Sequence, residues 1–347
     1  MSAAETGDPP GVDTAALRAY LETAAPGLVG GPLRAELIAG GKSNLTYVVG
    51  DGRAEWVLRR PPLGHVLPTA HNMAREYEVI SALHGTAVPV PETYVLCADE
   101  SVLGAPFYLM SHVPGVVYRT GADLAGFSAA DGRAVSTALV DVLAALHSVR
   151  PDDVGLVGFG RPEGYLERQV RRWTKQLAAS RSRDLPGIEE LAGRLAASVP
   201  SSARVALLHG DYKLDNVLVD AGDPGRIGAV LDWEMSTLGD PLADLGLVLV
   251  YWERGDRHAD SRVPRTSEIP GFLTADDVIA RYADRTGTDV GDIGWYRALG
   301  GYKLAVISEG IHYRYVQGLT VGEGFANAGD IVPSLVARAH EVLDGVG

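Results

Sequence analysis

A polar block in the second half of the chain constrains the fold and the chemistry more than any other part of the sequence. Residues 209–216 read His-Gly-Asp-Tyr-Lys-Leu-Asp-Asn, and Asp232 follows sixteen residues after Asn216. Asp and Asn favour turns, so each of these residues taken singly is typical of a turn. Runs with the apolar character of strands flank the block, at residues 205–208, 217–219 and 227–231. The combined spacing indicates a functional site.

The residue types in this block suit phosphoryl transfer. That reaction needs a group that orients or deprotonates the attacking hydroxyl, and ligands for the Mg²⁺ that neutralises the phosphates. We therefore expect Asp211 to be the catalytic residue that meets the hydroxyl. Asn216 and Asp232 are the expected Mg²⁺ ligands, because hard oxygen ligands suit that ion. ATP and Mg²⁺ are the expected cofactors.

The first third of the chain shows a strand, helix, strand order. Apolar runs predict strands between residues 33 and 60, with Asp51-Gly52 as a hairpin turn because both residues tolerate positive φ. Residues 72–84 carry apolar side chains on one helical face, and two further strands are predicted at 93–97 and 106–112. This order is typical of a small α+β lobe that ends near residue 112.

After Pro114-Gly115 the chain is predicted to be mostly helical. Ser128 and Asp131 have the spacing of an N-cap pair, and an apolar stripe follows them down to His147. Further helices are predicted at residues 165–179, 188–199, 275–286, 295–317 and 332–343.

Charge and cysteine content exclude several classes of protein. The 347 residues carry a net charge of −13, which argues against a nucleic-acid partner, because binding to phosphate needs a basic surface. The first ten residues lack a secretory pattern, and the apolar run at 245–252 is far too short to cross a membrane. We expect a cytoplasmic protein with no membrane partner and with residues 1–12 as a disordered leader. The single cysteine, Cys97, excludes an internal disulfide and is expected to be a small buried apolar residue.

Three stretches together resemble the aminoglycoside phosphotransferase family, which shares the protein-kinase fold. They are residues 40–47 (Gly-Gly-Lys-Ser-Asn-Leu-Thr-Tyr), 209–216, and 231–234 (Leu-Asp-Trp-Glu). They are most similar to the subgroup fused in some proteins to acyl-CoA dehydrogenases, and the resemblance extends from about residue 33 to about residue 317. It implies an α+β, two-lobed, protein-kinase-like fold. A small antiparallel-sheet N-terminal lobe with one helix would precede a larger, mainly helical C-terminal lobe.

The resemblance also implies roles along the chain. Residues 13–112 correspond to the nucleotide-binding lobe and residues 113–347 to the catalytic and substrate lobe. The catalytic base of the family matches Asp211, and its two metal ligands match Asn216 and Asp232. Gly210 stands where protein kinases have the arginine of His-Arg-Asp. Glu234 replaces the glycine of Asp-Phe-Gly, which argues against a large flip of this segment.

Ser43 and Asn44 are the expected phosphate-side donors of the N-terminal lobe. Gly41-Lys42-Ser43 is not the end of a Walker A loop, because that motif needs a glycine where this chain has Glu36. A position between two strands favours a hairpin loop that covers the phosphates. A plain glycine-rich turn is the alternative.

A kinase-type site also needs a cation on the third strand and a carboxylate on the following helix. The family usually has lysine there, whereas this chain has Arg59 followed by Arg60; Glu76 is the matching carboxylate. Arginine keeps the charge and can fork onto phosphate or carboxylate oxygens. We favour Arg59, because Trp56 and Leu58 form the better core-facing set against the helix. The alternative is a surface cation pair on an edge strand.

Residues 107–112 resemble the strand and hinge whose backbone receives adenine, so Met110 and His112 are expected cofactor-binding positions. Asp244 lies in a segment that resembles the one that ties down the catalytic loop in the family, so its expected role is structural. His147 is expected to pack in the core.

Two sets of side chains bear on the acceptor. A polar set at helical spacing on residues 295–317 could line a pocket: Tyr302, Glu309, His312 and Tyr313. A basic set would suit an anionic acceptor such as a hydroxyacyl-CoA: Arg168, Arg171, Arg172 and Lys175. A solvated helix face is the alternative for each set.

The function expected from all of this is an ATP-dependent small-molecule phosphotransferase with an alcohol group as acceptor. One alternative is an aminoglycoside-modifying kinase, which differs only in its substrate. Another is a non-catalytic nucleotide-binding module, against which the intact set of Asp211, Asn216 and Asp232 argues. The sequence gives no indication of the oligomeric state.

Overall fold

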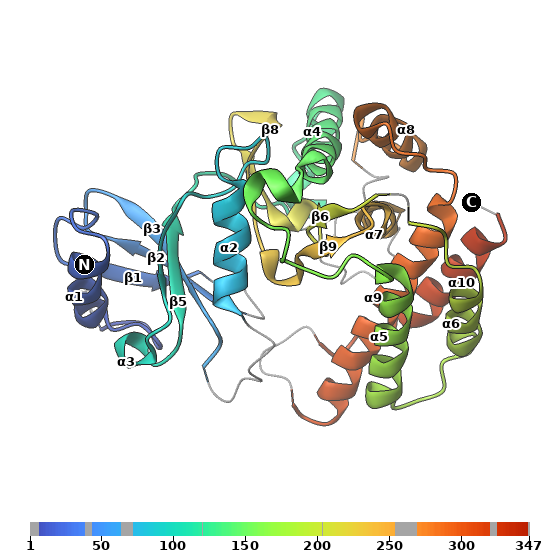
Figure 1. Cartoon of the computed structure of the whole chain (residues 1–347), viewed down its shortest axis with the longest axis horizontal. Helices are drawn as coiled ribbons and strands as arrows, with labels where there is room; N and C mark the ends of the chain where they lie inside the picture. The colour runs from blue at the N-terminus through green and yellow to red at the C-terminus, as the bar shows by residue number, and fades with distance from the viewer. Residues whose placement is uncertain are drawn as a thin grey trace. The chain divides into compact units, whose positions relative to one another are not determined.

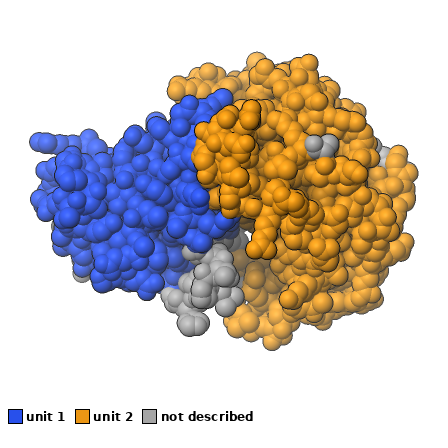
Figure 2. Space-filling model, viewed as in Figure 1, with its two compact units in different colours: residues 1–115, 228–234 blue, residues 116–227, 235–347 orange. Residues whose placement is uncertain are grey.

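The chain divides into two compact units in the computed structural model (Figure 2). The structure describes residues 7–38, 44–63, 72–119, 121–202, 204–253, 269–319 and 325–345. Unit 1 comprises Met1–Gly115 and Gly228–Glu234, and unit 2 comprises Val116–Ile227 and Met235–Gly347. The first boundary lies close to the predicted one at residue 112. The return of residues 228–234 to unit 1 has no counterpart in the sequence analysis.

Unit 1 is built on a five-stranded antiparallel sheet with the order β1-β2-β3-β5-β4 (Figure 1). Its strands are β1 (Arg34–Leu37), β2 (Leu45–Gly50), β3 (Glu55–Arg60), β4 (Thr93–Cys97) and β5 (Phe107–Ser111). Its helices are α1 (Thr14–Ala24), α2 (Met73–Leu83) and the single turn α3 (Glu100–Leu103). Asn72 caps α2 by accepting a hydrogen bond from the backbone N–H of Arg75, which is why this helix begins where it does.

The two faces of β3 contact different parts of unit 1, because successive side chains along a strand point to opposite faces. Trp56 and Leu58 point into a core that includes Leu17 and Leu21 of α1, with Cys97 buried in the same cluster as expected. Arg59 points to the other face and pairs with α2. Arg59 is thus the arginine that pairs with Glu76, and its role toward the phosphates stays a prediction. The reason given for preferring Arg59 was wrong. Trp56 and Leu58 pack toward α1, a helix that the sequence analysis did not anticipate.

The expectation of a disordered leader over residues 1–12 is wrong for its last part. Val12 is only 4% exposed in the core of unit 1, and the Tyr47 hydroxyl donates to the carbonyl of Pro10 over 2.6 Å. The Arg60 guanidinium donates to the carbonyls of Gly11 and Leu103. These contacts come from distant strands, so the polar composition of the segment did not reveal them. Residues 1–6 lie outside the described residues.

Unit 2 is mainly helical, as predicted. Its long helices are α4 (Ala129–Ser148), α5 (Tyr165–Ser180), α6 (Ile188–Ala197), α7 (Leu242–Glu253), α8 (Ala275–Thr286), α9 (Ile293–Val316) and α10 (Val332–Leu343). Ser128 and Asp131 form a reciprocal capping box at the start of α4, which confirms that reading of the sequence. Helices α7 and α9 cross closely, because a Cβ on Gly246 would lie 2.4 Å from the carbonyl oxygen of Tyr296.

Two short antiparallel ribbons flank the polar block of the sequence. The first pairs β6 (Ala206–Leu208) with β9 (Thr237–Gly239), and the second pairs β7 (Val217–Asp220) with β8 (Asp223–Val230). The block thus leaves β6 and enters β7, with a single 3₁₀ turn at Leu214–Asn216 between them. Among the helices the structure describes, none is both long and apolar enough to cross a membrane.

Candidate active site

The loop at residues 209–216 is held from within unit 2 by a buried carboxylate. Asp244, near the start of α7 and 3% exposed, accepts the backbone N–H of His209 over 2.6 Å and that of Gly210 over 3.0 Å. Gly210 has φ +85, and a Cβ there would lie 2.5 Å from the carbonyl oxygen of Met235. A side chain is therefore excluded at this turn for two independent reasons. Asp244 has the structural, loop-holding position expected of it.

A chain of buried polar groups supports Asp244. The His147 ring lies with Nε2 3.4 Å from Asp244 Oδ2 and Nδ1 2.7 Å from the Tyr282 hydroxyl. Burial alone would raise the pKa of Asp244, but the contact with His147 and the charges of His209 and Lys303 together lower it. His147 is buried as expected, yet it contributes hydrogen bonds as well as packing.

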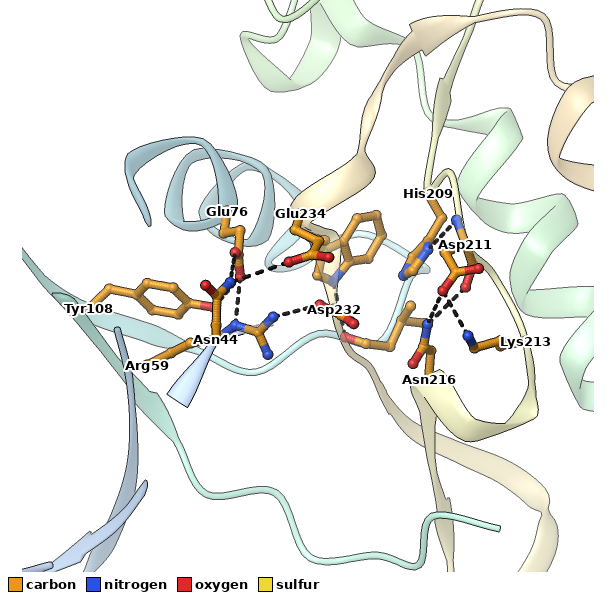
Figure 3. A network of polar contacts seen from close by, with 12 residues as sticks. Asn44, Arg59, Glu76, Tyr108, His209, Asp211, Lys213, Asn216, Asp232 and Glu234 are labelled. Carbon is orange, nitrogen blue, oxygen red and sulfur yellow. Dashed lines mark hydrogen bonds and ion pairs between the residues drawn. The ribbon is translucent and has the colours of Figure 1, made fainter. Parts of the chain in front are cut away.

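Asp211 carries the densest set of polar contacts in the loop. Its Oδ2 lies 2.8 Å from the Lys213 ammonium and 3.3 Å from Asn216 Nδ2, while its Oδ1 accepts from the Tyr251 hydroxyl over 2.7 Å. Figure 3 shows Lys213 and Asn216 reaching Asp211 from one side of the loop. Burial would raise the pKa of Asp211, but the charge of Lys213 and these hydrogen bonds lower it. The group is thus an ionised carboxylate, 24% exposed, that can accept a hydrogen bond from a hydroxyl.

Asn216 is oriented by its contacts with Asp211. Its Nδ2 donates to the carbonyl oxygen of Asp211 over 2.8 Å and to Oδ2 of the same residue over 3.3 Å. These contacts use the amide nitrogen, so the amide oxygen is the atom that can coordinate a hard cation.

Unit 1 gathers a second polar network around Glu76 of α2. The Arg59 guanidinium lies 2.8 Å from Glu76 Oε2 and 2.5 Å from Asp232 Oδ1, so one cation bridges two carboxylates (Figure 3). The Tyr108 hydroxyl donates to Glu76 Oε2 over 3.0 Å, and Asn44 Nδ2 donates to Oε1 over 2.8 Å. Burial raises the pKa of Glu76, and Arg59 opposes that shift.

Asp232 has an unusual backbone. Its φ of +65 makes it the one non-glycine residue with positive φ in the described part of the chain. For an L-residue this conformation costs roughly 1–2 kcal/mol, and aspartate is among the residues that tolerate it best. Such strain concentrates where function requires a particular side-chain direction. Here it accompanies the contact of the Asp232 carboxylate with Arg59.

The other predicted positions have more ordinary surroundings. Ser43 lies outside the described residues. Asn44 is 2% exposed, and its side-chain nitrogen contacts Glu76 and, at 3.4 Å, Glu234. A role for Asn44 at the phosphates stays a prediction. Met110 is buried within β5, and His112 just beyond that strand has Nδ1 3.0 Å from Glu55 Oε2. Their role toward adenine also stays a prediction.

The structure also brings in residues that sequence reasoning missed. Lys213 lies inside the polar block itself, and its charge two residues after Asp211 was an available signal. Tyr251 is a polar-tipped residue in the apolar run 245–252. Lys303 of α9 donates to the carbonyl of Gly210 over 2.5 Å and lies 5.6 Å from the Trp173 ring centre.

Two members of the polar set on the helix at 295–317 neither line an open pocket nor lie on a solvated face. Tyr302 and Glu309 are both 0% exposed. The Tyr302 hydroxyl lies 3.1 Å from Thr174 Oγ1, and Glu309 pairs with Arg183 over 2.9 Å, so both side chains brace α9 inside unit 2. In the basic set, Arg168 is partly buried, and the others are exposed on α5: Arg171, Arg172 and Lys175.

Comparisons with known proteins bear on the family of this chain. The model of the phosphotransferase enzyme family matches residues 34–290. Acyl-CoA dehydrogenase family member 11 of Rattus norvegicus is 37% identical over 330 residues, which cover 92% of this chain and 42% of that protein. The chain therefore spans less than half the length of that curated relative.

The chain is also similar to solved structures of aminoglycoside phosphotransferases. A provisionally assigned aminoglycoside phosphotransferase of Ralstonia eutropha JMP134 has a TM-score of 0.85 at 33% identity, covering 96% of this chain and 99% of its own. An aminoglycoside phosphotransferase crystallised with ADP and hygromycin B has a TM-score of 0.61 at 15% identity, covering 90% and 94%. The second likeness shows a shared fold alone. The predicted α+β two-lobed kinase-like fold and the resemblance to the subgroup linked with acyl-CoA dehydrogenases are confirmed.

Proposed function

This chain belongs to the phosphotransferase enzyme family, and we propose that it transfers the γ-phosphoryl group of ATP to a hydroxyl group of a small molecule. The observation that carries the proposal is the Asp211 carboxylate. It is ionised, partly exposed, and held by Lys213 and Asn216.

In the proposed reaction Asp211 accepts a hydrogen bond from the acceptor hydroxyl and takes its proton as the oxygen attacks the γ-phosphorus. The bond between that phosphorus and the oxygen bridging to the β-phosphate breaks, and ADP leaves with the electron pair. Because the lowered pKa makes Asp211 a weak base, its first task is to orient the hydroxyl. Lys213, 2.8 Å away, keeps the carboxylate ionised until the proton is transferred.

Asn216 and Asp232 are the proposed Mg²⁺ ligands, since an amide oxygen and a carboxylate are the hard oxygen donors that this ion prefers. When bound, it would neutralise charge on the phosphates. Arg59 would add its guanidinium to the same task, positioned by Glu76 at 2.8 Å. Ser43 and Asn44 would face the phosphates, and the backbone at Met110 and His112 would receive adenine.

The acceptor we propose is a metabolic hydroxyl compound that is neutral or anionic, such as a hydroxyacyl-CoA or a related acid. Exposed Arg171, Arg172 and Lys175 on α5 support an anionic compound, and Lys303 adds a cation beside the loop that holds Asp211. A polycationic aminoglycoside would instead need clustered carboxylates. We also propose that the protein works in the cytoplasm, where ATP is available.

The test is an ATP-consumption screen over a library of hydroxyl compounds that includes hydroxyacyl-CoAs and aminoglycosides. Asp211→Asn serves as the matched control, because it keeps the shape of the side chain and removes its charge. We expect the wild-type chain to consume ATP with at least one neutral or anionic compound, and Asp211→Asn to do so at least about 100-fold more slowly. Equal consumption by both chains would refute the role of Asp211. Turnover of aminoglycosides alone would show that the acceptor is an aminoglycoside and not a neutral or anionic compound.

A further inference from the structure

Tyr251 of α7 makes a contact with Asp211 that the proposed reaction leaves unexplained. Its hydroxyl donates to Asp211 Oδ1 over 2.7 Å, and its ring lies 5.1 Å from the Lys213 ammonium. The side chain is only 9% exposed. Burial raises the pKa of Tyr251, and the negative charge of Asp211 raises it further, so the phenol stays protonated and always donates.

Counting acceptor sites on Asp211 shows what this contact does. An ionised carboxylate has about four lone-pair sites, two on each oxygen. Lys213 and Asn216 take the two sites on Oδ2, and Tyr251 takes one on Oδ1. One site on Oδ1 is left over, and it adjoins the tyrosine hydroxyl.

We propose that Tyr251 is a positioning residue: it fixes the Asp211 carboxylate so that the acceptor hydroxyl binds to the remaining lone pair of Oδ1, beside the tyrosine hydroxyl. This rests on the proposed function, in which Asp211 meets the acceptor. Without Tyr251, only the contacts at Oδ2 hold the carboxylate, and rotation about the bond to Cβ would turn Oδ1 away from the acceptor. The position of Tyr251 is itself secured, because α7 packs closely on α9 at Gly246.

Tyr251→Phe isolates the hydroxyl, because the ring and its contact with Lys213 are kept. Tyr296→Phe is the matched control, since the Tyr296 hydroxyl also donates to a carboxylate of unit 2, Oδ2 of Asp240, over 2.8 Å. The assay is Mg·ATP hydrolysis by the full chain with water as the acceptor. Asp211→Asn is measured in parallel.

We expect Tyr251→Phe to lower kcat by about 10-fold or more at an unchanged KM for ATP, because a hydrogen bond to a charged group orients the reacting carboxylate. Tyr296→Phe should leave both constants unchanged, although the two variants should lose similar amounts of thermal stability. A kcat for Tyr251→Phe no lower than that of Tyr296→Phe would overturn the inference alone. If Asp211→Asn hydrolysed ATP at the wild-type rate, the proposed function would be overturned, and the inference with it.

A second measurement requires no turnover. The Tm loss caused by Tyr251→Phe is compared in the wild-type chain and in an Asp211→Ala background. If the hydroxyl acts through Asp211, the loss should disappear once the carboxylate is gone. An equal loss in both backgrounds would show that Tyr251 stabilises unit 2 independently of Asp211 and would overturn the positioning role.

Discussion

Replacing Asp232 by alanine and by glycine should separate its proposed metal role from its backbone strain. Neither replacement has an oxygen ligand, and both lose the contact with Arg59 at 2.5 Å. We therefore expect both to lose the same Mg²⁺-dependent part of nucleotide affinity. Loss of residues that only orient metal ligands costs about 10–100-fold in affinity, so loss of a ligand should cost at least about 10-fold.

The glycine variant should be more stable than the alanine variant, which is the reverse of the usual order. At φ +65 alanine costs roughly 1–2 kcal/mol, whereas glycine adopts this conformation freely. Glycine also gives a more flexible unfolded chain, which costs about 0.5–1 kcal/mol. Both variants lose the contact with Arg59, so this loss does not change the difference in stability between them. The midpoints of these two ranges differ by about 0.75 kcal/mol, so the glycine variant should be the more stable one by roughly that amount.

Calorimetry with ADP in the presence of Mg²⁺ or of EDTA measures the first effect, and urea unfolding measures the second. Wild-type affinity for Mg·ADP in both variants would refute the assignment of Asp232 as a metal ligand. An alanine variant at least as stable as the glycine variant would refute the argument from strain. The two results are independent, so either part can fail by itself.

Three further changes test other parts of the proposed site. Asp211→Asn should lower kcat by about 10²–10⁴-fold while the KM for ATP stays the same, as steady-state kinetics on the identified acceptor would show; a variant retaining more than a tenth of wild-type kcat would contradict this. The pKa of Asp244 is lower in the folded chain than in the unfolded chain, so the ionised carboxylate stabilises the fold. This stabilisation is complete above the ordinary aspartate pKa and is lost as pH falls through the lower pKa of the folded chain. Urea midpoints between pH 6 and pH 3 should therefore fall more steeply for the wild type than for Asp244→Asn, and parallel curves would contradict this. Changing Arg168, Arg171 and Arg172 together to glutamine should raise the KM for a CoA-type acceptor and weaken its salt dependence without changing the KM for ATP; an unaltered acceptor KM at low and high salt would leave this set as a solvated helix face.

The sequence was sufficient for features that depend on local spacing. Asp211 and Asn216 are five residues apart in one loop, and the structure joins them by hydrogen bonds. The strand pattern favoured Arg59, and the structure pairs Arg59 with Glu76, but Trp56 and Leu58 pack against α1 and not against α2. Alternation along a strand separates two faces, but it does not say which helix covers each.

Features that depend on distant contacts escaped prediction. Tyr251 lies forty residues from Asp211 along the chain, and an apolar helix gives no hint of which loop its tyrosine touches. Glu309 was expected on a pocket lining or a solvated face because it is polar, yet it is buried and pairs with Arg183 from a remote segment. Val12 was assigned to a disordered leader because its neighbours are polar, and only the folded sheet provides its core position.

The way Asp244 holds the loop at residues 209–216 bears on which substitutions the loop can tolerate elsewhere in unit 2. Its two bonds to the backbone N–H groups of His209 and Gly210 depend on no exposed side chain. Substitutions on the outer face of α5, where Arg171 and Lys175 meet solvent, can accumulate without moving the loop. Under the proposed function, a change of charge on this face would alter the affinity for the acceptor while the two bonds that hold the loop stay in place.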